Sequence, residues 1–388
     1  MLQLDHGECV RFTRDFVVSH LRTMRGGWDL PASAEDPLDA DFPGAPWFMD
    51  SLELVTLSGM IAESFQVHRS GIEDMLLARR SVHDWAEIIH TSLQHYDQEM
   101  VFYTSGSTGV PKPVMHQTAL LQQEIAAIAA ELPSGIRRIV STVPAHHIYG
   151  FLFTILLPQH LMLETVPAAG VRPVLEDTDL VIAVPAVLRS WRARGASLPA
   201  GVTVVSSTAP LGDEDAAWVL QTGAKLVEVF GSSETAGIGV RRNREEGFRL
   251  FPYWERSKDG DQLWREGLPG QVPLLDSFEW LNERSFIYRG RKDHAVQIHG
   301  INVFPNQVEE KLGSHPLVQA AAVRSFESPA GTRLKAFIVP ADNTATAEIE
   351  QQLRNWAAQN LPIPERPAHY RFGSTLPRTE LGKAADFS

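Results

Sequence analysis

The sequence predicts an α/β protein: a large N-terminal domain of parallel sheet flanked by helices, a small α+β domain at the C-terminus, and a helical segment before both. Three observations lead to this prediction. Apolar residues recur at helical spacing within residues 8–95, strand-like and helix-like runs alternate from residue 101, and a shorter mixed unit follows Gly290. We therefore expect three parts, residues 1–95, 96–292 and 293–388.

The individual elements follow from the same patterns. In the first part, helical spacing predicts helices over residues 8–24, 52–65 and 82–93. In the second part we expect strands at 101–104, 138–143, 180–184, 202–206 and 226–230, with helices at 117–132, 185–194 and 213–222 between them. In the third part we expect helices at 306–312 and 347–360 and strands at 318–325, 333–339 and 369–372.

Composition excludes several classes of protein. Of the 388 residues, 44% are hydrophobic and 21% charged, which is ordinary for a globular protein and excludes a disordered or fibrous one. The single cysteine, Cys9, excludes a disulfide scaffold and a cysteine-ligated zinc site. A net charge of −12 argues against nucleic acid as a partner, and no apolar run approaches the ~20 residues of a transmembrane helix. We expect a cytoplasmic enzyme.

A loop rich in glycine and hydroxyl groups follows the strand predicted at 101–104. Its glycines allow close approach of the backbone to a ligand, its hydroxyls can donate to phosphate oxygens, and its lysine adds a cation. These residues are Thr104, Ser105, Gly106, Ser107, Thr108, Gly109 and Lys112. The loop does not match the Walker A pattern, because Lys112 is followed by Pro113. We expect a helix after it, and by itself it indicates only an anion site.

Five further motifs follow in order along the chain. They are Pro-Ala-His-His-Ile-Tyr-Gly at 144–150, Ser-Thr-Ala-Pro-Leu at 207–211, Phe-Gly-Ser-Ser-Glu-Thr at 230–235, Gly-Arg-Lys-Asp at 290–293 before Gly-Ile-Asn-Val-Phe-Pro at 300–305, and Pro-Arg-Thr-Glu-Leu-Gly-Lys at 377–383. With the Ser/Gly loop, this set resembles the adenylate-forming (AMP-binding) superfamily of acyl- and aryl-CoA synthetases. The resemblance covers roughly residues 96–388.

The resemblance implies that a carboxylic acid is joined to the α-phosphate of ATP with release of pyrophosphate, and that the acyl group then passes to a thiol. Glu234 would bind Mg²⁺, a cation that prefers carboxylate oxygen, and Thr235 would donate to the α-phosphate. Residues around the adenine would come from two motifs, Ser207, Thr208, Ala209 and Pro210 in the first and Phe230, Gly231 and Ser232 in the second. The alternative for the second motif is a simple helix N-cap.

The C-terminal motifs would complete the site. Asp276 and Arg291 would bind the ribose, although Leu274-Leu275 replaces the Thr-Gly that usually precedes this aspartate. Lys383 would reach the α-phosphate and the carboxylate from a small mobile domain that rotates about the hinge Asp293. His147 would lie beside the acyl pocket, the alternative being a hydrogen-bonded loop histidine.

The N-terminal segment suggests a second resemblance. Asp-Ser-Leu at 50–52 opens a predicted helix, as in acyl carrier proteins, where this serine carries phosphopantetheine. Ser51 is therefore a possible attachment site. Asp and Ser are also favoured at helix starts, and the glycine that usually precedes the motif is missing. We prefer a helical bundle without a prosthetic group.

The sequence thus predicts an ATP- and Mg²⁺-dependent acid–thiol ligase. Its compact build is similar to ligases of aryl-polyene and xanthomonadin-type pigment pathways, which implies an aromatic acid such as 4-hydroxybenzoate and an acyl carrier protein as acceptor. A basic cluster, Arg241, Arg242 and Arg244, is a candidate landing surface for that carrier. Two alternatives stay open: an acyl- or aryl-CoA synthetase, and a non-catalytic nucleotide-binding descendant.

Overall fold

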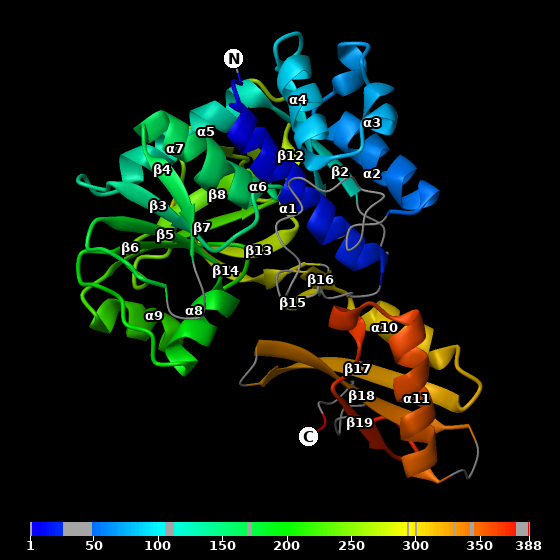
Figure 1. Cartoon of the computed structure of the whole chain (residues 1–388). Helices are drawn as coiled ribbons and strands as arrows, with labels where there is room; N and C mark the ends of the chain where they lie inside the picture. Colours follow the sequence, from blue (N-terminus) through cyan, green and yellow to red (C-terminus); the bar gives the residue numbers. More distant parts are fainter. Residues whose placement is uncertain are drawn as a thin grey trace. The chain divides into compact units, whose positions relative to one another are not determined.

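The chain forms two compact units in a computed structural model (Figure 1), which describes residues 2–25, 49–104, 112–168, 173–292, 295–298, 301–328, 331–341, 345–377 and 387. The first unit holds the described residues up to Leu274 together with 278–288, and the second holds 275–277 and the described residues from Arg289 onward. No helix in the described part of the chain is long and apolar enough to cross a membrane.

The three helices predicted in the N-terminal segment are present as α1 (His6–Met24), α2 (Ser51–Ser64) and α4 (Val82–Leu93). The structure adds two short elements that were not predicted, the 3-10 turn η2 (Val67–Arg69) and the helix α3 (Met75–Ala78). The helices α1 and α2 each begin with a capping box. Asp5 and Asp50 each accept a hydrogen bond from a main-chain N–H in the first turn, and the glutamate three residues later bonds back to the capping residue.

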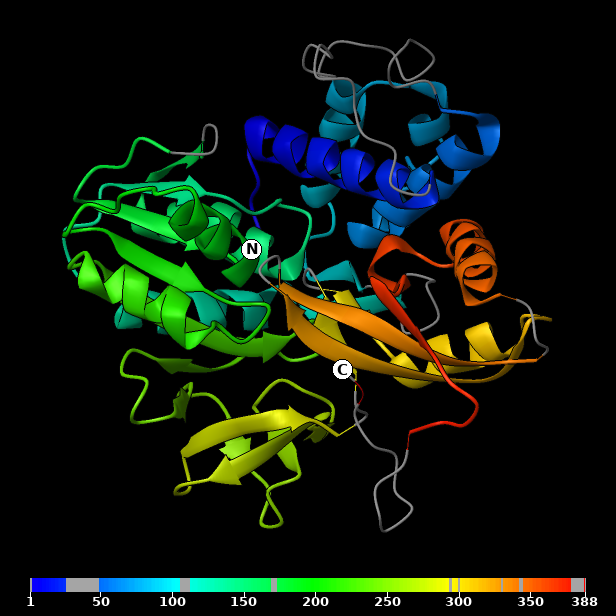
Figure 2. The ribbon, with the colours of Figure 1, turned by 90° about the horizontal axis from the view of Figure 1, so that it is seen from below.

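The helix α1 is part of the core of the first unit. Figure 2 shows it running along the other N-terminal helices. Its Phe12 is 1% exposed and packs edge-to-face on Phe65 and Phe151, with ring centroids 4.7 and 6.1 Å apart. Asp15 accepts a hydrogen bond of 2.7 Å from the main-chain N–H of Ala145. The segment therefore shares its apolar interior with the rest of the unit.

A nine-stranded sheet forms the centre of the first unit, in the order β13-β14-β9-β8-β7-β6-β5-β3-β4. The strands are β3 (Arg138–Ser141), β4 (Glu164–Pro167), β5 (Asp179–Ala183), β6 (Thr203–Ser206), β7 (Lys225–Ser232), β8 (Ala236–Arg241), β9 (Phe248–Leu250), β13 (Asp276–Trp280) and β14 (Ser285–Arg291). β4, β3, β5, β6 and β7 are parallel, which confirms the predicted α/β class. β8 and β9 continue the sheet in antiparallel pairing.

Helices cover both faces of this sheet (Figure 1). On one face lie α5 (Thr118–Glu131), α6 (Ile148–Phe151), the π-helical turn η3 (Leu152–Leu156) and α7 (Leu157–Leu161), and on the other α8 (Pro185–Ala193) and α9 (Asp213–Gln221). Every residue of β5 is buried. Leu180 and Ile182 belong to one apolar cluster and Val181 and Ala183 to the other, as expected for a strand covered on both faces.

The strand predicted at 101–104 is present, but it does not pair with the strands that we expected. β1 (Glu99–Thr104) does not join the parallel sheet but pairs antiparallel with β2 (Lys112–Gln117). The Ser/Gly loop therefore lies between two strands, and the helix α5 begins only at Thr118, after β2. The local pattern of apolar residues predicts a strand but not its neighbour, because pairing is decided by long-range packing.

The remaining strands of the first unit form a small antiparallel sheet of β10 (Glu255–Arg256), β11 (Gln262–Trp264) and β12 (Val272–Pro273). The second unit contains β15 (Val296–Ile298), β16 (Ile301–Val303), α10 (Pro305–Gly313), β17 (Val318–Ser328), β18 (Gly331–Pro340), α11 (Thr346–Asn360), η4 (Ile363–Glu365) and β19 (His369–Phe372). β17 and β18 form a long hairpin, coloured orange in Figure 2, and β19 pairs parallel with β18. Its own apolar core includes Val308, Leu334 and Leu353.

Candidate functional site

The carboxyl ends of β5, β6 and β7 lie next to one another because these strands are parallel and adjacent. This edge is where open α/β sheets bind ligands. The hydroxyl oxygen of Tyr149 lies 3.0 Å from the main-chain oxygen of Ala183 and 3.1 Å from that of Val205, so its single hydrogen is shared between the two strand ends.

The predicted segment 207–210 leaves β6 at this edge. Ser207 is buried, and its hydroxyl donates to the main-chain oxygen of Val229 at 2.8 Å. Thr208 has a φ of +77°, an unusual value for a residue with a side chain, which often marks functional loops. Thr208 and Ala209 are half-buried and Pro210 is exposed. These three residues are therefore accessible to a ligand at the strand ends.

The Glu234 motif forms a tight turn between β7 and β8. Ser232 and Thr235 bond reciprocally across it, each main-chain N–H donating to the other's hydroxyl at 3.2 Å. Gly231 is required here, because a Cβ would lie 2.1 Å from the main-chain oxygen of Ala236. The N-cap alternative is therefore wrong, since a strand follows. The turn leaves Glu234 exposed and Thr235 buried.

Two side chains that sequence analysis missed hold this turn. His116, on β2, approaches the main-chain oxygen of Ser233 with its Nε2 at 2.7 Å. The acceptor is a carbonyl, so Nε2 carries the hydrogen. Burial lowers the pKa of His116. The strand that follows the Ser/Gly loop is thereby fixed to the Glu234 turn.

Glu124, on α5, is the second missed residue. It is 1% exposed, and its Oε1 accepts a hydrogen bond of 2.8 Å from the main-chain N–H of Gly237, three residues after Glu234. Burial raises the pKa of Glu124 to about 7. Tyr253 donates to the main-chain oxygen of the same glycine at 3.0 Å. No local pattern marks these residues, because their partners are more than 100 positions distant or lie on another element.

The Ser/Gly loop is described only at its ends. Thr104, half-buried, closes β1, and Lys112, exposed, opens β2 directly opposite it in the strand register. Ser105, Gly106, Ser107, Thr108 and Gly109 lie outside the described residues. The loop thus connects Thr104 and Lys112, which are directly paired, and it ends four residues before His116.

Phe230 is half-buried at the end of β7 and is surrounded by aromatic rings. The ring centroids of Phe248, Phe278, Phe286 and Tyr288 lie 5.5, 5.4, 5.6 and 5.2 Å from its own. This packing fixes the orientation of the Phe230 ring at the strand ends.

In the second unit, Asp276 and Arg291, the two residues expected to bind the ribose, lie close to each other. Both side chains are 11% exposed, and Nη1 of Arg291 lies 4.0 Å from Oδ1 of Asp276. The main-chain N–H of Lys292 donates to the oxygen of Leu275 at 2.9 Å, which secures the turn despite the Leu-Leu substitution. Asp293 and Lys383 lie outside the described residues.

His147 precedes α6, and its ring is tilted by 42° against that of His146, with ring centroids 4.0 Å apart. The His147 ring makes no hydrogen bond to any residue in the described ranges, so the hydrogen-bonded alternative is not supported. Dense protein surroundings lower the pKa of His147 to about 4, although part of its side chain stays exposed. The ring centroid of His20, on α1, lies 5.7 Å from that of His146, so His20 extends this cluster of rings.

The proposed basic landing surface is largely neutralised, which corrects that prediction. Arg241 and Arg244 both pair with Glu228, at 2.8 and 3.3 Å, and Arg242 pairs with Glu131 at 2.6 Å. These carboxylates come from β7 and α5, so only the fold reveals them.

Ser51 lies at the first position of α2, exposed to solvent. The surrounding motif has a structural role of its own: Asp50 and Glu53 form the capping box, and Glu53 also pairs with Arg25 at 2.7 Å. The Asp-Ser-Leu motif is thus explained as the start of a helix.

The donor set fits a nucleotide-bound Mg²⁺. Among the described residues, no three His, Cys, Asp or Glu side chains gather in an arrangement that could hold a metal. Glu234 offers one exposed carboxylate on the turn. Mg²⁺ is commonly held by one or two carboxylates together with substrate phosphates and water.

Comparison with known proteins agrees with this arrangement. Residues 58–255 match the family model described as AMP-binding enzyme, and residues 307–383 match that of the AMP-binding enzyme C-terminal domain. The 4-coumarate–CoA ligase of Halorhodospira halophila is 39% identical over 393 residues, covering 99% of this chain and 100% of that protein. The 4-coumarate–CoA ligase of Rhodobacter capsulatus is 38% identical over 360 residues, covering 87% and 89%.

Solved structures share the fold. An o-succinylbenzoate CoA synthetase from Bacillus subtilis aligns with a TM-score of 0.58 at 18% identity, over 74% of this chain and 67% of that one. An amide bond synthetase from Marinactinospora thermotolerans also aligns with a TM-score of 0.58, at 21% identity, over 75% and 69%. The chain belongs to the AMP-binding enzyme family and is an adenylate-forming ligase that joins a carboxylic acid to a thiol, with ATP and Mg²⁺ as cofactors.

Proposed function

We propose that this ligase activates a 4-hydroxylated aromatic acid of the 4-coumarate type and transfers it to CoA. The observation that carries the proposal is the near full-length similarity, at 39% identity, to a 4-coumarate–CoA ligase. Two further relatives at 38 and 39% identity bear the same name.

In the proposed first step, the acid carboxylate attacks the α-phosphorus of ATP, a P–O bond to pyrophosphate breaks, and acyl-AMP forms. Glu234 would hold Mg²⁺, which would offset charge on the phosphates, and Thr235 would donate to the α-phosphate. The segment 104–112 carries the β- and γ-phosphates. Phe230 and residues 207–210 flank adenine, and Asp276 with Arg291 binds the ribose.

In the proposed second step, the CoA thiol attacks the acyl carbonyl and AMP leaves. Lys383 acts in the first step as a point charge near the crowded oxygens, and residues 293–388 then move as one domain about Asp293. His147 forms one wall of the acyl pocket. The close contacts of α1 with the loop before His147 support a role for the N-terminal segment as scaffold of that wall.

Transfer of 4-hydroxybenzoate to an acyl carrier protein is the second candidate. It is supported by a relative named 3,4-dihydroxybenzoate–[aryl-carrier protein] ligase, 23% identical over 74% of this chain. The paired state of Arg241, Arg242 and Arg244 weakens it, because an acidic carrier needs free positive charge on its partner.

Pyrophosphate release with ATP and Mg²⁺ across a panel of acids tests the first step. The panel contains 4-coumarate, cinnamate, 4-hydroxybenzoate, benzoate, acetate and octanoate. We expect the highest kcat/KM with 4-coumarate, and loss of at least 10³-fold in Lys383→Ala, which corresponds to roughly 4 kcal/mol of transition-state stabilisation. Lys258→Ala, which removes an exposed lysine from a loop of the first unit, is the matched control and should behave as wild type.

Thioester formation from CoA and from an acyl carrier protein, each offered with the preferred acid, then identifies the acceptor. Preference for acetate or octanoate would reject the aromatic acid. Thioester formed on the carrier protein but not on CoA would reject the proposed acceptor and favour the second candidate.

A further inference from the structure

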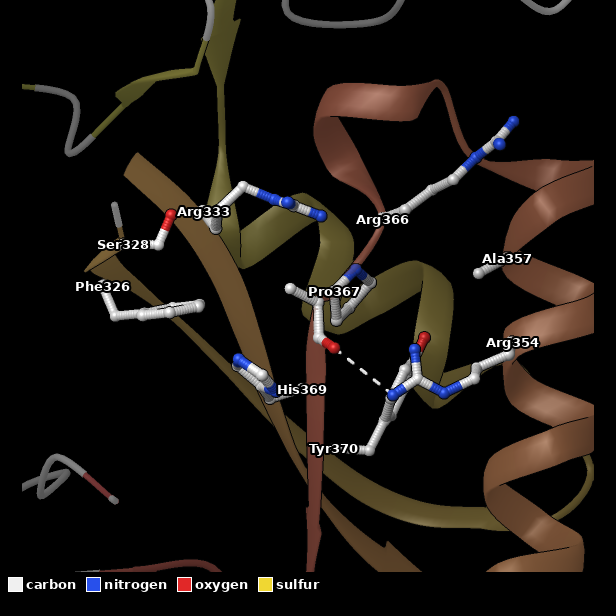
Figure 3. Close-up of a pocket in the computed structure, with 10 residues that line it drawn as sticks. Phe326, Ser328, Arg333, Arg354, Ala357, Arg366, Pro367, His369 and Tyr370 are labelled. Carbon is white, nitrogen blue, oxygen red and sulfur yellow. Dashed lines mark hydrogen bonds between the residues drawn. The ribbon is translucent and has the colours of Figure 1, made fainter. Parts of the chain in front are cut away.

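The second unit contains a pocket of about 450 Å³ at the start of β19, which Figure 3 shows. One of its cations is already bonded, because Arg354 on α11 donates to the main-chain oxygen of Ala368 at 3.3 Å and pairs with Glu350 at 2.6 Å. These bonds connect α11 to the start of β19 and explain the position of this arginine. A more complete arrangement of polar groups lies in the first unit, directly after the Glu234 turn.

Both main-chain groups of Gly237 are held by side chains from two other parts of the fold. Its N–H donates to Oε1 of Glu124 at 2.8 Å, and its oxygen accepts from the Tyr253 hydroxyl at 3.0 Å and from the Trp254 indole N–H at 2.7 Å. We call these three side chains the Gly237 clamp. Glu124 and Trp254 are each 1% exposed, so their bonds are shielded from water and correspondingly strong. A Cβ on Gly237 would lie 2.5 Å from Oε1 of Glu124, which means that the clamp is built around a glycine.

Arg265 joins the two parts of the fold that supply the clamp. It is 3% exposed, and the carbon of its guanidinium lies 3.9 Å from the ring centroid of Tyr253 and 5.2 Å from that of Trp254. Its Nη2 donates to the main-chain oxygen of Leu120, on α5, at 2.9 Å. Because α5 also carries Glu124, this buried cation holds both halves of the clamp together.

The clamp lies at the base of the turn that carries Glu234. Gly237 is opposite Gly231 in the antiparallel pairing of β7 and β8, next to the pair of Ser232 and Ala236, and residues 233–235 form the turn between them. Ala236 has a φ of +56°, a left-handed value that costs energy in a residue with a side chain and persists only where the surroundings enforce it. The clamp, one residue further along the strand, supplies that constraint.

The Glu234 carboxylate depends on this turn for its position. The side chain is exposed and makes no hydrogen bond or ion pair with any residue that the structure describes. It is therefore directed by the main chain that carries it, and whatever fixes that main chain also fixes the carboxylate. Mg²⁺ demands near-ideal octahedral geometry, with ligands at roughly 2.0–2.1 Å, so a small displacement of a carboxylate weakens its contact with the cation.

We propose that the Gly237 clamp positions Glu234 for the Mg²⁺ that accompanies ATP. The three members of the clamp are then positioning residues, which act through the turn and not by contact with the metal. The inference rests on the proposed role of Glu234 as the Mg²⁺ ligand. Loss of the clamp should weaken the contribution of Mg²⁺ to ATP binding and leave the binding of metal-free ATP intact.

Calorimetry on the full chain tests this with ATP as the probe, titrated once in EDTA and once in excess Mg²⁺. The ratio of the first Kd to the second measures the contribution of Mg²⁺. We expect Trp254→Phe and Tyr253→Phe each to lower this ratio about threefold and Glu124→Met about tenfold, with the Kd in EDTA unchanged. Glu124→Gln keeps an oxygen acceptor for the Gly237 N–H and should restore the ratio. Trp264→Phe changes an exposed tryptophan on β11 in the same way and is the matched control.

Glu234→Gln shows whether the effect passes through the turn carboxylate. Alone it should lower the ratio, and in its background Trp254→Phe should cause no further decrease, since the two changes act on one interaction. An equal decrease in both backgrounds, or clamp variants that weaken ATP equally with and without Mg²⁺, would overturn the proposal.

The proposed function and the clamp fail in different ways. A ratio that Glu234→Gln leaves unchanged would reject the proposed role of Glu234, and the inference with it. A ratio that falls in Glu234→Gln but stays at the wild-type value in all three clamp variants would overturn the inference alone.

Discussion

His116 and Ser233 are joined by a hydrogen bond of 2.7 Å between the imidazole Nε2 and the main-chain oxygen, across 117 positions of sequence. The bond links β2, which follows the Ser/Gly loop, to the turn that carries Glu234. Because the two segments are the proposed sites for pyrophosphate and Mg²⁺, their relative position determines how the phosphates and the metal meet. Small displacements of such groups have large effects on rate.

We predict that His116→Phe lowers kcat/KM for pyrophosphate release roughly tenfold, equivalent to about 1.4 kcal/mol. The phenyl ring preserves packing on Phe102, whose ring centroid lies 5.9 Å away, but cannot donate to Ser233. His116→Gln retains an N–H donor and should recover part of the loss. His95→Phe, on an exposed histidine, is the control. Equal rates for His116→Phe and wild type would show that the bond does not position the site.

Glu124 should make stability depend on pH. Burial raises the pKa of this carboxyl to about 7 in the folded state, from an ordinary value of 4.5. Between these values the folded chain binds a proton that the unfolded chain has lost, so wild-type stability falls as pH rises from 4.5 to 7. Glu124→Gln keeps an oxygen acceptor for Gly237 and removes the titration.

The free energy of unfolding in urea, measured for both proteins from pH 5 to 8, tests this. Relative to wild type, Glu124→Gln should gain about 3 kcal/mol over that range and level off above pH 7. Because all other groups titrate alike in the two proteins, the difference isolates Glu124. Parallel curves would mean that this carboxyl is ionised in the folded protein well below pH 7.

His146 should act in the opposite direction. It is 4% exposed, neither ring nitrogen has a partner among the described residues, and burial places its pKa well below 6.5. Below pH 6.5 the unfolded chain gains a proton that the folded chain does not, so stability is lost as pH falls. His146→Phe should be at least as stable as wild type at pH 7.5 and lose less on acidification to pH 5.5. A less stable variant at pH 7.5 would show that the imidazole has a partner.

Ser51 should remain unmodified. The capping box of α2 and the Arg25–Glu53 pair explain the residues around it without a prosthetic group. Intact mass after co-expression with a phosphopantetheinyl transferase should equal the sequence mass, and Ser51→Ala should keep wild-type pyrophosphate release. A mass increase of one phosphopantetheine group, absent in Ser51→Ala, would establish the carrier role instead.

Local patterns in the sequence were enough to predict most helices and strands. α4 spans residues 82–93 as predicted from apolar spacing alone, and the parallel strands β3, β5, β6 and β7 appear where runs of β-branched residues stand. Periodicity and capping act between near neighbours, so they can be read from the chain directly. The Ser/Gly loop and the Glu234 motif also consist of consecutive residues, so their roles could be proposed from the sequence directly, and these roles stay predictions.

The sequence by itself determined the fold class, the order of the motifs and the chemistry they imply. Only the tertiary structure decided that β1 leaves the parallel sheet for β2, that Arg241 and Arg242 pair with Glu228 and Glu131, and that His116 is bonded to Ser233. These outcomes depend on which surfaces become buried against each other and on which charges then find partners. Both are properties of the packed chain, since burial and long-range pairing have no signature in neighbouring residues.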